Sequence, residues 1–204
     1  MSKGTLYIFS APSGAGKTSL VKALTSSLAD ISVSVSHTTR PMREGETNGV
    51  HYHFTSKEEF QDFVRKGQFL EHARVFDNYY GTSHAHIQEQ LEQGQDIILE
   101  IDWQGGEQVR KLIPDSVSIF ILPPSRQALE ERLTGRGQDS QDVINQRLHE
   151  AHEEMSHFGE YDYLIINDDF DQALAELSMI VQAKRLKVEK QKSTHHLLID
   201  ELLA

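Results

Sequence analysis

The 204-residue sequence contains no cysteine and few basic residues, and both shortages exclude whole classes of protein. Without cysteine there can be no disulfide scaffold, thiolate zinc site, iron–sulfur cluster or cysteine nucleophile. Twenty Lys and Arg stand against 31 Asp and Glu, which gives a net charge of −11. This acidic balance argues against a protein that coats nucleic acid or an anionic membrane surface.

Long hydrophobic runs are also missing. A run such as 117–124 is far short of the roughly 20 apolar residues that a membrane span needs. The N-terminal residues lead directly into a strand-like segment without the apolar core of a signal peptide, so we expect a cytoplasmic protein. A chain of this length can bury about 70% of its unfolded surface, which is enough for one large domain.

Short apolar runs alternate with longer amphipathic stretches along the chain. We predict buried strands over residues 5–10, 97–102, 117–122 and 163–166. We predict helices over residues 18–28, 106–113, 125–133 and 171 to about 192. Such alternation is typical of an α/β fold with a parallel sheet and helices on both faces.

Two polar stretches, residues 37–82 and 132–148, interrupt this alternation. The first carries strand patterns over 50–55, 69–75 and 79–82, with a helix predicted over 56–66. We interpret both stretches as insertions that rise from the ligand-binding edge of the sheet.

The segment Ala11-Pro12-Ser13-Gly14-Ala15-Gly16-Lys17-Thr18 follows a predicted strand and opens a predicted helix, which is the setting of a phosphate-binding P-loop. Its glycines let backbone N–H groups converge on phosphate oxygens at the positive end of the helix. Lys17 would reach the β- and γ-phosphates and Thr18 would hold Mg²⁺ through its hydroxyl. Ala11 stands where the motif usually has glycine, but a residue before proline is extended, a geometry that alanine adopts easily.

Glu100 and Asp102 close one of the apolar strands. P-loop enzymes place at this point a carboxylate that orders the water shell of the metal. We therefore expect Glu100 and Asp102 to contribute to a Mg²⁺ site with Thr18, through water.

The first insertion holds a pair of arginines, Arg40 and Arg43, beside a cluster of hydroxyl residues. Guanidinium pairs suit a phosphate dianion, which accepts bidentate, charge-assisted hydrogen bonds. The tyrosines that follow offer O–H donors without further charge, which predicts a second phosphorylated substrate.

In their order along the chain these segments resemble the bacterial guanylate kinase family. The resemblance is carried by the P-loop, Ser36-His37-Thr38-Thr39-Arg40, Phe69-Leu70-Glu71-His72-Ala73, Asn78-Tyr79-Tyr80-Gly81-Thr82 and Glu100-Ile101-Asp102-Trp103-Gln104-Gly105. It continues through Ile121-Leu122-Pro123-Pro124-Ser125, the stretch 132–137, and Tyr161 to Asp169, so it covers nearly the whole chain.

The resemblance implies an ATP-dependent, Mg²⁺-dependent transfer of a phosphoryl group to GMP, with dGMP also accepted. The implied catalytic residues are Lys17, Arg132, Arg136 and Arg147. The implied ATP-binding residues are Ala11, Pro12, Ser13, Gly14, Ala15, Gly16, Lys17, Thr18, Ser19 and, near the adenine, Asn167. The implied GMP-binding residues are Ser36, Arg40, Arg43, Tyr52, Glu71, Tyr80, Thr82, Glu100 and Asp102. Glu100 departs from the family, in which aspartate is frequent at this position.

The implied fold is a P-loop NTPase parallel sheet with helices on both faces, a small mixed-β nucleotide-binding insertion and a lid. Residues 1–35, 91–130 and 149–204 would form the core, the first with the P-loop and the last with a C-terminal helix. Residues 36–90 would form the GMP-binding insertion and residues 131–148 the lid.

Two other functions remain open at this stage. A related kinase could act on a phosphorylated sugar, although it would not need Ser36 and Glu71 to read a base. A guanylate-kinase-like domain could instead bind phosphopeptides without catalysis, although such domains usually have damaged P-loops, and this chain keeps Lys17 and Thr18.

The C-terminal segment is apolar, with Leu197, Leu198, Ile199, Leu202 and Leu203 close together. Its packing on the core and its packing on another subunit in a homo-oligomer are both compatible with the sequence.

Overall fold

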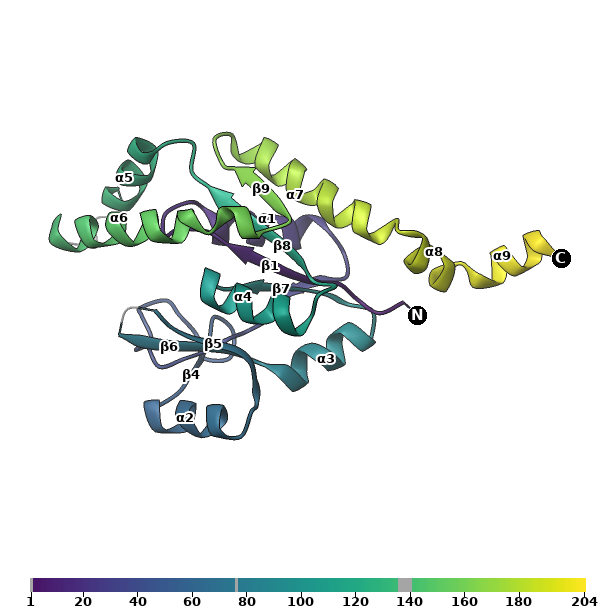
Figure 1. Cartoon of the computed structure of the whole chain (residues 1–204), viewed down its shortest axis with the longest axis horizontal. Coiled ribbons are helices and arrows are strands. Elements are labelled where there is room, and N and C mark those ends of the chain that lie inside the picture. The colour runs from purple at the N-terminus through teal and green to yellow at the C-terminus, as the bar shows by residue number, and fades with distance from the viewer. Residues whose placement is uncertain (1, 76, 136–140) are drawn as a thin grey trace.

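A computed structural model describes residues 2–75, 77–135 and 141–204, with only the backbone described for residues 141–145. A five-stranded sheet forms its centre (Figure 1). In spatial order the strands are β2 (Ile31–Val33), β7 (Asp96–Glu100), β1 (Leu6–Ser10), β8 (Val117–Leu122) and β9 (Tyr163–Ile166). All four pairings are parallel, so the carboxyl ends of the strands share one edge of the sheet.

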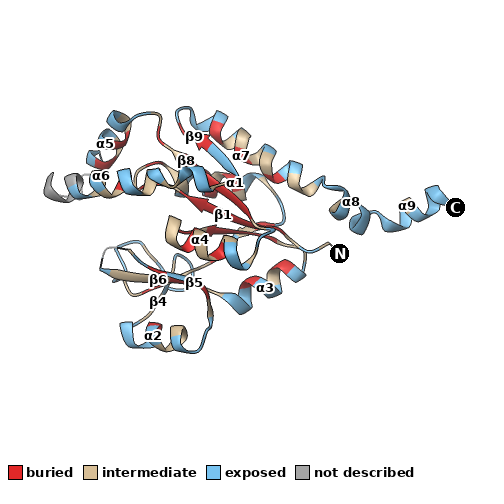
Figure 2. Ribbon diagram, viewed as in Figure 1, coloured by how far each residue is buried: buried red, intermediate tan, exposed pale blue. Residues whose placement is uncertain are grey.

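The central strand β1 is buried along its whole length, which explains its continuous apolar character. Because side chains alternate across a strand, Tyr7 and Phe9 enter the core on one face and Leu6 and Ile8 that on the other. Figure 2 shows this burial as a red band along the central strands.

Helices cover both faces of the sheet, as predicted. The helices α1 (Lys17–Ser27) and α7 (Phe170–Arg185) pack on the Tyr7 face, and α3 (His84–Glu92) and α4 (Trp103–Leu112) pack on the Leu6 face. The helices α5 (Arg126–Thr134) and α6 (Gln141–Ser156) pack against each other around Leu129 and Leu133. A short 3₁₀ turn, η1 (Phe158–Glu160), leads from α6 to β9.

The first insertion forms a second, mixed sheet, as predicted. Its order is β4 (His53–Phe54), β3 (His37–Thr38), β6 (Asn78–Ser83) and β5 (Phe69–Val75), and only β3 and β4 are parallel. The helix α2 (Lys57–Arg65) begins with a capping box in which Ser56 and Glu59 each bond the other's backbone N–H.

The strand predicted over residues 50–55 is mostly wrong, because only His53 and Phe54 form a strand. Residues 47–52 form a turn instead, in which the N–H of Gly49 donates to the carbonyl of Tyr52 at 2.8 Å. Gly49 has φ of 80°, a backbone conformation that a regular strand does not contain.

The long helix predicted from residue 171 to about 192 is divided. After α7 the chain turns at Leu186 and Lys187 and continues as α8 (Val188–Thr194) and α9 (His196–Leu203). The turn lets both segments reach Asp96, since Arg185 Nε lies 2.8 Å and Lys190 Nζ 3.6 Å from its carboxylate. A straight helix would carry Lys190 away from that buried acid.

Three other helices had no sequence prediction: α3, α6 and α9. Of these, α6 runs past residue 148, at which the predicted lid would end, and α8 and α9 lead away from the sheet (Figure 1). The helices of the described ranges include none that is long and apolar enough to cross a membrane.

Candidate active site

A cleft of about 320 Å³ lies at the carboxyl edge of the central sheet, between the P-loop and the second sheet. Its lining includes most of the residues that the sequence singled out: Ala11, Pro12, Ser13, Gly14, Gly16, Lys17, Thr18, Ser19, Ser36, Tyr52, Glu71, Tyr80, Glu100 and Asp102. Ala73, Val75, Ile101 and Glu154 complete the lining. Residues from six separate parts of the chain thus share one cavity.

The P-loop connects β1 to α1 in the conformation that anion binding requires. Gly16 is the N-cap residue of α1, with φ of 93°, and no side chain caps this end of the helix. The first turn of α1 carries no acidic residue. Its unpaired N–H groups and the positive end of the helix dipole are therefore available to a phosphate.

A methyl group on Gly16 would lie 2.4 Å from the amide nitrogen of Asn167. The buried Asn167 donates from Nδ2 to the carbonyl of Ala15 at 2.7 Å. Arg132 also donates to the carbonyls of Asn167 and Ala15, at 3.0 and 3.4 Å. Asn167 and Arg132 thus support the P-loop from outside the cleft lining.

Lys17 and Thr18 meet the end of β7. The Lys17 ammonium lies 3.5 Å from the carbonyl oxygen of Ile101, and the Thr18 hydroxyl donates to the Glu100 carboxylate at 3.0 Å. Oxygen donors of this kind suit Mg²⁺, which keeps several of its waters and binds through one or two protein groups and substrate phosphates. Among the described residues, His, Asp and Glu form no group of three or more that could hold a metal by themselves.

On the opposite wall of the cleft, Glu71 of β5 is almost completely buried, with 3% of its surface exposed. The Thr82 hydroxyl donates to Glu71 Oε1 at 2.5 Å, and the Ser36 hydroxyl lies 3.1 Å from that of Thr82. Burial raises the pKa of Glu71 to about 7, with a further contribution from the charge of Asp102 and opposition from the Thr82 hydrogen bond. Hydrogen bonds therefore connect the three predicted base-reading residues in the order Ser36, Thr82 and Glu71.

The helix α4 approaches Glu71 closely because it carries glycine at the contact. A Cβ atom on Gly105 would lie 2.5 Å from Glu71 Oε2. The same helix begins at Asp102, whose carboxylate accepts from the N–H of Gly105 at 3.0 Å. Burial raises the pKa of Asp102, while this hydrogen bond and Lys17 oppose the shift.

Tyr52 and Tyr80 are the aromatic pair of the cleft, with ring centroids 6.0 Å apart. The Arg40 guanidinium lies over the Tyr52 ring at 5.6 Å and forms an ion pair with Glu46 at 2.6 Å. Arg43 is exposed and does not line the cleft, although its backbone N–H donates to Glu46 at 2.7 Å. The two arginines of the predicted phosphate clamp are therefore organised around one glutamate.

Neither Arg132 nor Arg147, the two predicted catalytic arginines that the structure describes, is in the cleft lining. Arg147 lies on α6, partly buried, outside the lining, and Arg136 falls outside the described residues.

Glu154 is a cleft residue that the sequence reasoning missed. Burial raises the pKa of Glu154 to about 7, and Lys17 and the backbone N–H of Ser13 oppose this shift. The missed signal is the spacing of Leu148, Ala151 and Met155, which pack with α5 and mark one apolar face of a helix. Recognition of that helix would have identified the element that carries Glu154, whereas its position in the cleft follows from the packing of α6 against α5.

A parallel sheet with a P-loop after its central strand, beside a second sheet that carries a buried carboxylate facing the same cleft, is typical of a P-loop kinase of phosphorylated small molecules. Comparison with known proteins makes this assignment specific. The family model described as guanylate kinase matches residues 3–184. The chain belongs to the guanylate kinase family, a group of nucleoside monophosphate kinases.

Relatives named guanylate kinase are similar over their whole length. That of Pseudomonas fluorescens is 60% identical over 202 residues, which cover 99% of this chain and 98% of the relative. That of Photobacterium profundum is 56% identical over 206 residues, covering 100% of this chain and 99% of the relative. The crystal structure of guanylate kinase from Anaplasma phagocytophilum superposes with a TM-score of 0.77 at 33% identity, covering 94% of this chain and 95% of that one.

Proposed function

We propose that this enzyme transfers the γ-phosphoryl group of ATP to GMP, and also to dGMP, giving ADP and the corresponding diphosphate. The observation that carries the proposal is the buried chain of Glu71, Thr82 and Ser36 opposite the P-loop in one cleft. A phosphate loop alone indicates a nucleotide-dependent enzyme, whereas this chain of groups supports a guanine nucleotide as the acceptor.

Guanine fits the buried carboxylate, and adenine does not. Guanine presents the N1–H and an N2 amino group on one edge, and the two oxygens of Glu71 can accept from both. Adenine has a lone pair at N1 and no N2 amine, so it would leave a buried carboxylate unpaired. Sites built on such hydrogen bonds discriminate by about 10⁴-fold. We assign Thr82 and Ser36 to orienting the carboxylate and completing the base contact.

The phosphate of GMP would meet Tyr52, Tyr80, Arg40 and Arg43. Glu46 holds Arg40 close to the Tyr52 ring, which limits the freedom that the guanidinium loses on binding. Arg43 is exposed and would turn toward the phosphate. Glu100 and Asp102, which line the cleft between the two substrates, would bound the GMP site from the P-loop side.

ATP would bind through the P-loop, residues 11–19, with Asn167 near the adenine. Thr18, with Glu100 and Asp102 through water, would hold Mg²⁺, which supplies charge neutralisation to the bound phosphates. Lys17 would stabilise charge on the transferring group, and we assign the same role to Arg132, Arg136 and Arg147 on closure of the lid.

No general base is required for the transfer, because a phosphate monoester with a second pKa of about 6 is mostly dianionic at neutral pH. The protein's contribution is then alignment of the two substrates, charge stabilisation and exclusion of water. We place the reaction in the cytoplasm, the compartment of both nucleotide substrates.

A phosphosugar kinase and a non-catalytic phosphopeptide-binding domain are the competing functions. The first gives no role to Glu71 and Ser36, and the second gives no role to Lys17 and Thr18 in an intact P-loop. A coupled assay of ADP release with GMP, AMP, UMP and a sugar phosphate separates all three. We expect the specificity constant, kcat/KM, for GMP to be about 10⁴ times that for AMP. Equal turnover with AMP would refute the guanine assignment, and no ADP release with any acceptor would refute catalysis.

A further inference from the structure

The proposed reaction assigns no role to Glu154, a carboxylate that lines the cleft together with the P-loop. It comes from α6, whereas the other acids of the lining come from β5 and from the end of β7 and the residues that follow it. The half-buried Glu154 interacts with the ammonium of Lys17 and with the backbone N–H of Ser13. The P-loop would use these same groups to hold the phosphates of ATP. A carboxylate therefore lies beside a site that is built for anions.

The packing of α6 on α5 directs Glu154 toward the P-loop. Ala151, three residues before Glu154, is fully buried with Leu129 and Leu133 of α5. The same side of α5 reaches the P-loop, since a Cβ atom on Gly14 would lie 3.0 Å from Cδ1 of Leu129. The two helices and the P-loop thus form one packed unit, to which α5 contributes apolar groups at this contact.

A ring stack fixes the other side of Glu154. One turn after it, the His157 ring lies nearly parallel to that of Trp103, with centroids 3.7 Å apart and an interplanar angle of 6°. The same histidine lies 2.5 Å from the carboxylate of Glu160. Trp103 directly follows Asp102, which itself lines the cleft. Glu154 is therefore held at the cleft from both sides, and a nucleotide that enters meets it there.

The surroundings of Glu154 disfavour its charge except on the side of the P-loop. Burial above all, with the charges of Asp102 and Glu150, raises the pKa of Glu154 to about 7. Lys17 and the N–H of Ser13 act in the opposite direction. Like charges four residues apart, such as Glu150 and Glu154, also destabilise a helix. The ionised carboxylate is thus stabilised by the P-loop and opposed by the other acids that face it.

We propose that Glu154 is an internal competing anion of the P-loop, which neutralises Lys17 until a nucleotide binds and then opposes the phosphates of ATP and ADP. The proposal rests on the proposed use of the P-loop for ATP, but not on the identity of the acceptor. Backbone N–H groups and a lysine at a helix N-terminus hold phosphates firmly. An opposing carboxylate weakens this hold on the product ADP as well as on ATP, and so favours exchange of one for the other.

The variant Glu154→Gln tests the proposal, because it removes the charge and keeps the size of the side chain. Isothermal titration calorimetry with ATP and with ADP, at constant Mg²⁺ and without an acceptor, measures binding alone. At pH 8 we expect the affinity of the variant for both nucleotides to exceed that of the wild type by about tenfold, since a neighbouring like charge is removed. At pH 6 the two proteins should agree within about twofold, because Glu154 is then mostly protonated in the wild type. Titration of ATP, Asp102 and the histidines is common to both proteins and cancels in their ratio.

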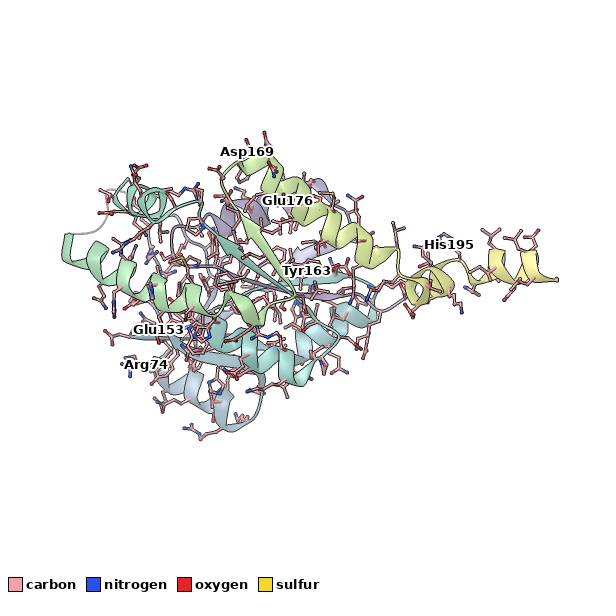
Figure 3. All side chains as sticks on the ribbon, turned by 45° about the horizontal axis from the view of Figure 1, so that its top comes forward. Arg74, Glu153, Tyr163, Asp169, Glu176 and His195 are labelled. Atoms are coloured by element: carbon pink, nitrogen blue, oxygen red, sulfur yellow. The ribbon has the colours of Figure 1, made fainter. Side chains whose placement is uncertain are left out.

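The matched control is Glu153→Gln. Glu153, labelled in Figure 3, is the preceding residue of α6, is exposed and lies outside the cleft lining. Its replacement removes the same charge from the same helix and should change ATP affinity by less than about twofold at either pH. Far-UV circular dichroism and thermal unfolding verify that both variants are folded.

Three results would overturn the proposal. The first is a Glu154→Gln variant that binds ATP no better than Glu153→Gln at pH 8. The second is weaker binding of ATP by Glu154→Gln, which would mean that the carboxylate serves the phosphates, for example through Mg²⁺-bound water. The third is a gain of equal size at pH 6 and pH 8, which would reflect the shape of the side chain and not its charge. Because no acceptor is present, each of these results is separate from a failure of the guanine assignment.

Discussion

Glu71 is buried beside a hydroxyl donor, Thr82, and a second carboxylate, Asp102. Burial and the charge of Asp102 disfavour the charged form, and the Thr82 hydrogen bond offsets them only in part, so the carboxyl group has a pKa of about 7, within the physiological range. The proposed contact with guanine N1–H and N2 requires the ionised form. Recognition of the base and titration of this group are therefore coupled.

The replacement Glu71→Gln should lower the affinity for GMP by about 100-fold, because charge-assisted hydrogen bonds are each worth about 1.5–3 kcal/mol. The affinity for ATP should stay within about twofold of the wild-type value. Isothermal titration calorimetry with each nucleotide measures both. The wild-type affinity for GMP should rise by up to about tenfold per pH unit toward pH 7 and then level off. The part of this dependence due to Glu71 should vanish in Glu71→Gln, in which the GMP phosphate still titrates. An equal loss of affinity for ATP and GMP would contradict the base-reading role.

Lys17 offers a second test at the same scale. Lys17→Ala should lower kcat by about 100-fold or more, since it removes a positive charge aimed at the transferring phosphoryl group. GMP affinity should persist, because the ammonium lies on the P-loop side of the cleft. A steady-state assay with direct GMP titration separates the two effects, and a GMP affinity that falls as far as kcat would count against the assignment.

At the scale of elements, local sequence determines where helices begin. Asp102, Ser125 and Asp169 each accept a backbone N–H three residues ahead, at 3.0, 3.0 and 2.8 Å. The beginning of α1 differs, because Gly16 leaves the N–H groups to the ligand. The helices α4, α5 and α7 are thus capped by side chains, whereas the N-terminus of α1 is left open.

The capping box of α2 should contribute measurably to stability. Ser56→Ala should lower the free energy of unfolding by about 1 kcal/mol, because the N–H of Glu59 loses its acceptor. Ser26→Ala, in the last turn of α1, is the matched control and should change stability little or raise it, since alanine is the better helix former. Urea unfolding of both variants makes the comparison; equal effects would mean that the cap contributes nothing specific.

At the scale of the whole molecule, the cleft gathers carboxylates, and their burial makes stability depend on pH. Glu71 and Glu154 each have a pKa raised from 4.5 to about 7. A raised carboxyl pKa contributes stability that is fully present below the unfolded value and is lost as pH rises through the folded one. His37 acts in the opposite direction, because burial and His53 lower its pKa to about 4.

We therefore expect the ligand-free protein to lose on the order of 3 kcal/mol through Glu71 between pH 5 and pH 8. Comparison with Glu71→Gln at each pH isolates this contribution from that of His37, which both proteins share. Urea unfolding at pH 5.5, 6.5 and 7.5 provides the measurement. A difference between the two proteins that does not change with pH would show that Glu71 keeps an ordinary pKa.

Four of the five strands of the central sheet, all except β2, and the P-loop could be predicted because their signals are local. Continuous apolar runs such as 117–122 require burial on both faces, and the order of strand, glycine loop and helix around Lys17 is compatible with few structures. The mixed sheet was also predicted as an insertion, although a turn that includes Gly49 stands in place of most of the strand predicted over residues 50–55.

Other features depended on contacts between distant residues. The division between α7 and α8 follows from the buried Asp96, which attracts both Arg185 and Lys190. The place of Glu154 depended on the packing of α6 against α5, and the exposure of α9 on the direction in which α8 is fixed. The sequence by itself determined which residue types were present for phosphate and base recognition, because these follow from chemistry and spacing. Only the tertiary structure decided which of them share a desolvated cleft, because burial and charge interactions arise between segments that the fold brings together.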